Sequence, residues 1–190
     1  MKKNHRVLWP LLVLLALAGC AGRHGDVYHD QNMDFGAVQT VAIMPFTNLT
    51  RDSSAGERVR DVFINRLLAT GALYVIPVGE VARGVAKAEI ANPANLSAED
   101  VVKLGGMIKA QALITGVVKE YGEVRAGTSS ASTISVSAEM LETQTGRAVW
   151  SASSTKGGIT VTDRLFGGGG QPMETVTVQA VNDLIDKLFK

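Results

Sequence analysis

Hydrophobic and polar residues follow two patterns along this chain. The earlier part has short apolar runs separated by stretches with helical period, and the later part alternates with period two. The apolar run Val38–Phe46 is rich in branched side chains, contains Pro45 near its end and predicts a buried strand. Residues 57–70 place their apolar side chains on one helical stripe closed by Gly71, so they predict an amphipathic helix. That stripe consists of Val59, Val62, Phe63, Leu67 and Thr70.

Three more elements are predicted before the period changes. Residues 73–78 indicate a second strand, and residues 80–89 indicate a second helix of modest strength. A third helix follows an Asn-Pro break, because Ser97 and the acidic residue three positions later have capping-box spacing. Ser53 and Ser54 are the candidate caps of the first helix.

The later part of the chain alternates with period two and predicts strands. Residues 112–124 and 132–141 are the first two, the Thr-Gly turn at residues 143–146 leads into an antiparallel strand at 147–155, and residues 176–189 form a closing helix. Gly146 is expected to supply a positive φ in that turn. The predicted fold is therefore α/β (α+β), a mixed sheet packed with helices in the order β-α-β-α-α-β-β-β-α.

The first twenty residues have the pattern of an export signal. A basic start precedes the apolar run Val7–Ala18, which is short for a membrane span, and small residues follow it. Leu17-Ala18-Gly19-Cys20 closely resembles the lipobox of bacterial lipoproteins. This resemblance implies cleavage between Gly19 and Cys20, a diacylglycerol on the Cys20 sulfur and a third acyl chain, such as palmitate, on its amino group. The alternatives are an ordinary signal peptide with an incidental cysteine and an uncleaved buried helix.

These features divide the chain into a signal peptide at 1–19, a lipid anchor and flexible tether at 20–36 and a single periplasmic domain at 37–190. The polar stretch Ala21–Asp34 reaches at most about 45–50 Å when fully extended, so the domain is expected to stay close to its membrane. No Asp follows the cysteine directly. By resemblance to the lipoprotein sorting pattern, this favours the outer membrane, with the domain facing the periplasm.

Composition narrows the chemistry further. Without the signal, the chain holds 16 Lys and Arg against 18 Asp and Glu, so no nucleic-acid footprint is expected. Acylation of Cys20, the only cysteine, leaves no disulfide, thiol nucleophile or cysteine metal site. His5 leaves with the signal, and His24 and His29 fall in the predicted tether, which leaves the domain without histidine chemistry. We therefore predict no catalytic, cofactor-binding or metal-binding residues and no enzyme activity.

Three stretches together resemble a known group of envelope proteins. They are Val41–Phe46, the alanine-rich entry and strand at Ala110–Gly122, and Thr145–Trp150, which has the pattern Thr-Gly, three residues, Trp. This is the TolB N-terminal-domain-like fold shared by the curli secretion lipoprotein CsgG, the peptidoglycan-synthase activator LpoB and uncharacterised lipoprotein families. The resemblance covers about residues 38–190. It implies an envelope assembly protein, with Trp150 and the Thr-Gly turn as fold markers.

Several polar or glycine-rich groups have two interpretations. Gly167–Gly170, beside Phe166, has the composition of a phosphate loop but lacks the following Lys-Ser/Thr, so a flexible or interface loop is favoured. Thr128–Ser132 is interpreted as a solvated hairpin tip rather than a nucleophile. Lys103 and Lys109 are expected on the outer face of a helix. The acidic residues Glu120, Glu123 and Glu139 fit a solvent-facing sheet surface better than a cation site.

The function predicted from these observations is a membrane-anchored, non-catalytic binding or assembly factor for envelope proteins. Its partners are the membrane, reached through the lipid on Cys20, an envelope protein and, in one arrangement, further copies of itself in a ring. The alternatives are a subunit of a CsgG-like oligomeric secretion channel, a cell-wall enzyme and an LpoB-like activator of peptidoglycan synthesis. The glycine-rich candidate hairpins speak against the channel, and the short tether speaks against LpoB-like reach through the cell wall.

Overall fold

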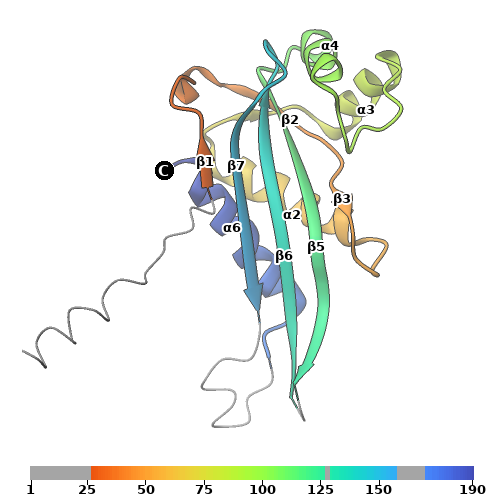
Figure 1. Ribbon diagram of the computed structural model, residues 1–190, viewed down its shortest axis with the longest axis vertical. Coiled ribbons are helices and arrows are strands. Elements are labelled where there is room, and N and C mark those ends of the chain that lie inside the picture. The colour runs from red at the N-terminus through yellow and green to blue at the C-terminus, as the bar shows by residue number, and fades with distance from the viewer. Residues whose placement is uncertain (1–26, 127–128, 158–169) are drawn as a thin grey trace, which may run out of the picture.

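A long antiparallel hairpin forms the spine of the structure, a computed structural model that describes residues 27–126, 129–157 and 170–190 (Figure 1). Seven strands and four α-helices are described in these ranges, together with one 3-10 turn, η1. The strands are β1 Val27–His29, β2 Thr40–Ile43, β3 Thr47–Asn48, β4 Tyr74–Val75, β5 Ala112–Ala126, β6 Ser129–Glu142 and β7 Ala148–Gly157. The helical elements are η1 Phe35–Ala37, α2 Ala55–Thr70, α3 Val78–Lys87, α4 Ala98–Ile108 and α6 Met173–Leu188.

The sheet is mixed, as the sequence predicts. Its order is β1-β7-β6-β5-β2-β4, with β3 also paired to β5. Strand β2 runs parallel to β4 and β5, whereas β5, β6 and β7 form an antiparallel meander. A register shift lies between Val118 and Glu120, where Lys119 is the extra residue of β5. The predicted elements all occur in the predicted order, and β1, η1 and β3 are additional to them.

Helices cover the two faces of the sheet unequally. Helices α2 and α6 lie along one face, where Phe63, Trp150 and Leu184 are fully buried. The indole Nε1 of Trp150 donates a hydrogen bond to the carbonyl oxygen of Lys187 at 3.3 Å, which joins β7 to α6. On the other face, α3 and α4 pack over one end only, around Leu104 and Leu113. The remainder of that face carries polar side chains.

Most of the predicted helix caps and turn glycines occur in the structure. Ser97 and Asp100 form a complete capping box at the start of α4, Gly71 ends α2 at φ 65°, and Gly146 has φ 72° in the β6–β7 turn. The cap of α2 differs. Ser54 precedes the helix but makes no capping hydrogen bond, because its hydroxyl group donates to the carboxylate of Asp52 at 2.7 Å.

The predicted tether is wrong at its domain end. Residues 20–36 were expected to be flexible, but Val27–His29 form β1, which pairs antiparallel with β7 at Ala152–Trp150. His29 therefore belongs to the fold, and the expectation of a folded part without histidine is also wrong. A strand of three residues shows no usable alternation, and its partner lies more than a hundred residues further along the chain, so no local signal marks it.

Two other boundaries depart from the predictions. The expected strand at 73–78 is reduced to Tyr74–Val75, because Pro77 caps the next helix and α3 begins at Val78. The expected tip at residues 128–132 lies partly inside β6, which begins at Ser129. The long hairpin therefore extends further than the alternation predicts.

Candidate binding surface

The candidate binding surface is the polar part of the sheet face that α3 and α4 leave uncovered. Along β6, Ile134, Val136 and Ala138 are buried towards α2 and α6, while Ser135, Ser137 and Glu139 alternate with them on the opposite face. Strand β7 repeats the pattern, because Ser151 and Ser153 flank the buried Ala152. Strand alternation therefore places several serine hydroxyl groups side by side on the uncovered face of the sheet.

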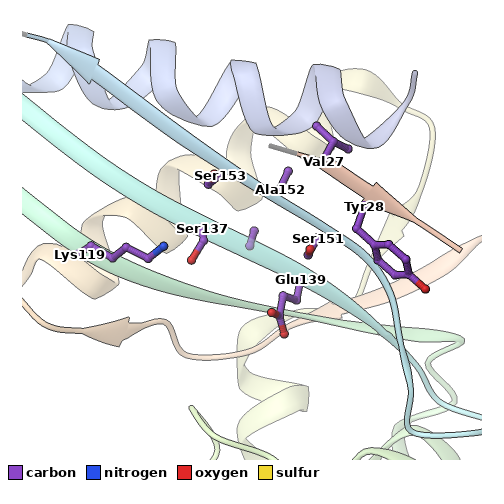
Figure 2. Close-up of a pocket in the computed structure, with 9 residues that line it drawn as sticks. Val27, Tyr28, Lys119, Ser137, Glu139, Ser151, Ala152 and Ser153 are labelled. Atoms are coloured by element: carbon purple, nitrogen blue, oxygen red, sulfur yellow. The ribbon is translucent and has the colours of Figure 1, made fainter. Parts of the chain in front are cut away.

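A shallow depression of about 350 Å³ lies on this surface. Figure 2 shows Ser137, Glu139 and Ser151 along it, with Lys119 extending from β5 and Tyr28 from β1. Tyr28 is 47% exposed, so its ring is available for contact. Among residues 27–126, 129–157 and 170–190, neither Lys119 nor Glu139 forms an ion pair.

A second depression, of about 480 Å³, continues the first across the sheet. The two share Ser137, Ala138 and Glu139, and the second extends to Thr115 on β5 and Asn92 between α3 and α4. Hydroxyl, amide and carboxylate groups supply both donors and acceptors, and Leu49, which is 66% exposed, adds an apolar part with Val117 in the second depression. The surface is suited to a hydrated contact that combines hydrogen bonds with some apolar burial.

A separate apolar pocket of about 700 Å³ lies between the β1–β2 connection and the end of α6. Phe35, Leu73 and the 48% exposed Phe189 line it, with His29 and Asp30 beside them. Hydrogen bonds from the backbone and side chain of Asn32, with the nearby Arg147 guanidinium, hold the pKa of Asp30 below its usual value despite some desolvation. The Nε2 atom of His29 is buried and has no hydrogen-bond partner in the described residues.

The structure separates the residues that the sequence singled out. Cys20 and Gly19 lie outside the described residues, as do Thr128, Phe166 and Gly167–Gly169. Glu139 lies on the candidate surface, while Glu120 and Glu123 are exposed further along β5. In the part of the chain that the structure describes, no three His, Cys, Asp or Glu side chains are grouped so that they could hold a metal ion.

The two lysines of α4 behave differently. Lys103 donates a hydrogen bond from Nζ to the carbonyl oxygen of Ala88 at 2.7 Å, which fastens α4 to the end of α3. Lys109 is the C-cap residue of α4 and has φ 56°. Lys103 is thus exposed, as predicted for an outer face, and also has a structural contact that its spacing does not reveal.

Sequence reasoning missed two residues of the surface, Tyr28 and Lys119. Tyr28 falls within the predicted tether, and its only signal is an aromatic residue next to valine in a polar stretch. Lys119 interrupts the alternation of β5, and such an interruption is the one sequence signal of its bulge. As for membrane-spanning elements, the helices described by the structure include none with the length and apolar character needed to cross a bilayer.

Solved structures share this fold at low sequence identity. The PelC dodecamer from Paraburkholderia phytofirmans matches with a TM-score of 0.54 and 16% identity, over 79% of this chain and 88% of that one. Lipoprotein GNA1162 from Neisseria meningitidis matches with a TM-score of 0.57 and 20% identity, over 78% and 98% of the two chains. The LpoB C-terminal domain from Salmonella enterica gives 0.49 and 12%, over 66% and 86%. The matches to PelC and GNA1162 confirm the predicted mixed α/β fold.

Sequence comparison identifies the family itself. Curated proteins yield no match to this chain. A family model described as "Putative lipoprotein GNA1162-like" matches residues 34–190, which include every described element from η1 to α6. The chain belongs to the GNA1162-like lipoprotein family.

Proposed function

We propose that this protein is a lipoprotein anchored to the outer membrane through Cys20, where it acts as a non-catalytic binding or assembly factor for envelope proteins. The observation that carries the proposal is the agreement of two independent parts of the chain. Residues 17–20 have the lipobox pattern, and residues 34–190 match a family described as lipoproteins. Two or more acyl chains hold a protein firmly at a bilayer without crossing it.

The uncovered sheet face is the part of the domain proposed to bind the partner. Its side chains project from three long neighbouring strands, so their spacing is held by the strand ladders and little order is lost on binding. Lys119 and Glu139 add opposite charges without ion-pair partners in the described residues. Such charges favour a partner with a complementary pattern and guide its orientation.

A homo-oligomeric assembly is the second candidate. The solved PelC structure is titled a dodecamer, and its fold is similar to that of this chain. Assembly of this chain into a ring would accord with the binding role or with the alternative role of a secretion-channel subunit. In the LpoB-like alternative, the domain must reach its partner across the cell wall. Strand β1 shortens the available tether, which makes that alternative less favourable than the sequence alone suggests.

The anchor is tested by intact-mass analysis and membrane fractionation of the protein isolated from the bacterium that naturally produces it. The native protein should begin at Cys20, carry the mass of three acyl chains and sediment with the outer membrane. Cys20→Ser should abolish the modification and leave the membrane fraction, whereas the control Ala21→Ser should behave as the native protein. A free thiol on the native protein would contradict the anchor.

The binding surface is tested by photo-crosslinking in intact cells. A crosslinking residue at Ser137 or Ser153 should join the protein to an envelope protein or to a second copy, which mass spectrometry identifies. Asp61 on the exposed side of α2 is the control position and should give no such product. Equal labelling from Asp61, or none from either strand position, would show that the partner binds elsewhere.

A further inference from the structure

The direction of β1 determines which end of the molecule lies nearer the proposed lipid anchor. Val27 pairs with Ala152 and His29 with Trp150, so the chain enters β1 from the end of the sheet where β7 finishes. Strand β6 begins at this same end, since Thr133 near its start pairs with Gly157, the last residue of β7. The end of the β5–β6 hairpin therefore lies at the end of the sheet where β1 begins (Figure 1).

The length of the anchor segment can be compared with the length of the hairpin. Seven residue steps join Cys20 to Val27, which span at most about 25 Å when fully extended. On the sheet, Val27 is level with Ala152 and hence with Ala138 of β6. Nine residue steps of β6 separate Ala138 from Ser129, which is about 30 Å of strand. The hairpin therefore reaches further from Val27 than the anchor segment does.

The described residues at the hairpin end are compatible with a lipid surface. Val124 is 56% exposed although it is aliphatic. Arg125, its neighbour, is exposed and has no ion pair among the described residues, and Glu123 on the other side is likewise exposed. One apolar side chain between charged ones suits the headgroup layer, where an apolar group is buried shallowly and charges stay hydrated.

We propose that the end of the β5–β6 hairpin is a second membrane contact, with Val124 and Arg125 held in the headgroup layer because the segment between Cys20 and β1 is shorter than the hairpin. This inference rests on the proposed anchor at Cys20. With the strands along the membrane normal, even a fully extended segment leaves the pair Ala126–Ser129 about 5 Å beyond the level of Cys20 and Val124, which pairs with Ala131, roughly level with it. The contact orients the domain, so that α3 and α4 at the other end of the sheet face away from the bilayer.

The inference is tested with a fluorescent probe on a single introduced cysteine. Acylation blocks Cys20, so a probe on Val124→Cys in the full acylated protein reports from that position alone. Val102→Cys on α4 is the matched control, because Val102 is also exposed, at 42%, and lies at the opposite end. The proteins are placed in phosphatidylethanolamine–phosphatidylglycerol vesicles that contain a lipid with a nitroxide quencher near its headgroup.

The expected result is roughly threefold stronger quenching at position 124 than at position 102, as for a group buried shallowly in the interface. Equal quenching in acylated, vesicle-bound protein would overturn the hairpin contact and leave the anchor standing. Protein that lacks the acyl mass and does not float with the vesicles would overturn the anchor, and the inference with it.

A lengthened anchor segment tests the reach argument separately. A flexible Gly-Ser insertion of about 20 residues between Asp26 and Val27 adds roughly 25 Å of typical reach, so the hairpin is no longer held down. Quenching at position 124 should fall to the level at position 102 while the protein stays on the vesicles. Quenching that ignores the insertion would overturn the claim that the short segment holds the hairpin at the bilayer.

Discussion

The carboxylate of Asp183 joins α6 to β7 through two lysines. Its Oδ2 atom accepts a hydrogen bond from Lys187 Nζ at 2.9 Å, and Oδ1 lies 3.4 Å from Lys156 Nζ on β7. Lys187 Nζ also donates to the carbonyl oxygen of Ser153 at 2.7 Å. Burial alone would raise the pKa of Asp183, but the hydrogen bond from Lys187 and the charges of both lysines outweigh it and lower that pKa.

The first prediction follows from this group of charges. Asp183→Asn should lower the free energy of unfolding at neutral pH by about 1 kcal/mol, a value reduced by solvent screening of a partly exposed pair. Because the folded pKa is lowered, the stabilisation is present above the unfolded pKa and is lost as pH falls through the folded value. Urea unfolding at several pH values should therefore show the two proteins converging below about pH 4.

Asp186→Asn is the matched control for that measurement. Asp186 lies on the same helix, is exposed and forms no ion pair among the described residues. Its replacement should change the unfolding free energy little at any pH. A similar loss in both variants would assign the effect to the net charge of α6 rather than to the contacts of Asp183.

Among the elements, α4 depends on its capping box. The hydroxyl group of Ser97 accepts from the backbone N–H of Asp100 at 3.1 Å, and the Asp100 carboxylate accepts from the backbone N–H of Ser97 at 3.1 Å. Ser97→Ala should cost about 1 kcal/mol of unfolding free energy in urea titrations. Ser53→Ala, an exposed serine ahead of α2, should cost almost nothing. Equal effects would show that α4 does not need this cap.

The same substitution, glycine to alanine, should have opposite effects on stability at Gly146 in the β6–β7 turn and at Gly106 inside α4. Gly146 has φ 72°, and a Cβ atom there would lie 2.5 Å from the carbonyl oxygen of Ala98 at the start of α4. Gly146→Ala should therefore destabilise the domain by about 1–3 kcal/mol. Gly106 inside α4 has open space around its Cβ position, so Gly106→Ala should stabilise it by about 0.5–1 kcal/mol. Thermal unfolding of both variants distinguishes these outcomes.

The sequence predicts elements well where their signal is local. The capping box at Ser97, the left-handed Gly146 and the alternation of β6 each depend on neighbouring residues, and all three occur. Strand β1 could not be predicted in this way, since three residues of β1 are ordered by pairing with distant β7. The surface was predicted in part. Alternation places Glu139 on the solvated face, but Tyr28 comes from β1 and Lys119 from a bulge.

At the scale of the whole molecule, β1 is an additional strand of the sheet that lies outside the residues matched by the family. The match begins at residue 34, after β1 has ended. A soluble protein that starts at residue 31, and therefore lacks the signal, Cys20 and β1, should still fold, but it loses the β1–β7 pairing and the Arg147–Asp30 ion pair. Its melting temperature should fall by several degrees, as expected for a loss of about 1–2 kcal/mol. Complete unfolding at room temperature would make β1 essential to the core.

Because the chain passes from the proposed anchor directly into β1, any pull on the lipid is applied first to three residue pairs, Val27–Ala152 to His29–Trp150. A force along the strand loads these hydrogen bonds in shear before it reaches the hydrophobic core behind β7. Strand β1 would detach from β7 before the rest of the domain unfolds, and its residues would then lengthen the segment between the domain and the membrane. Detachment of β1 under force would thus extend the connection to the membrane by a few residues and spare the rest of the domain from unfolding.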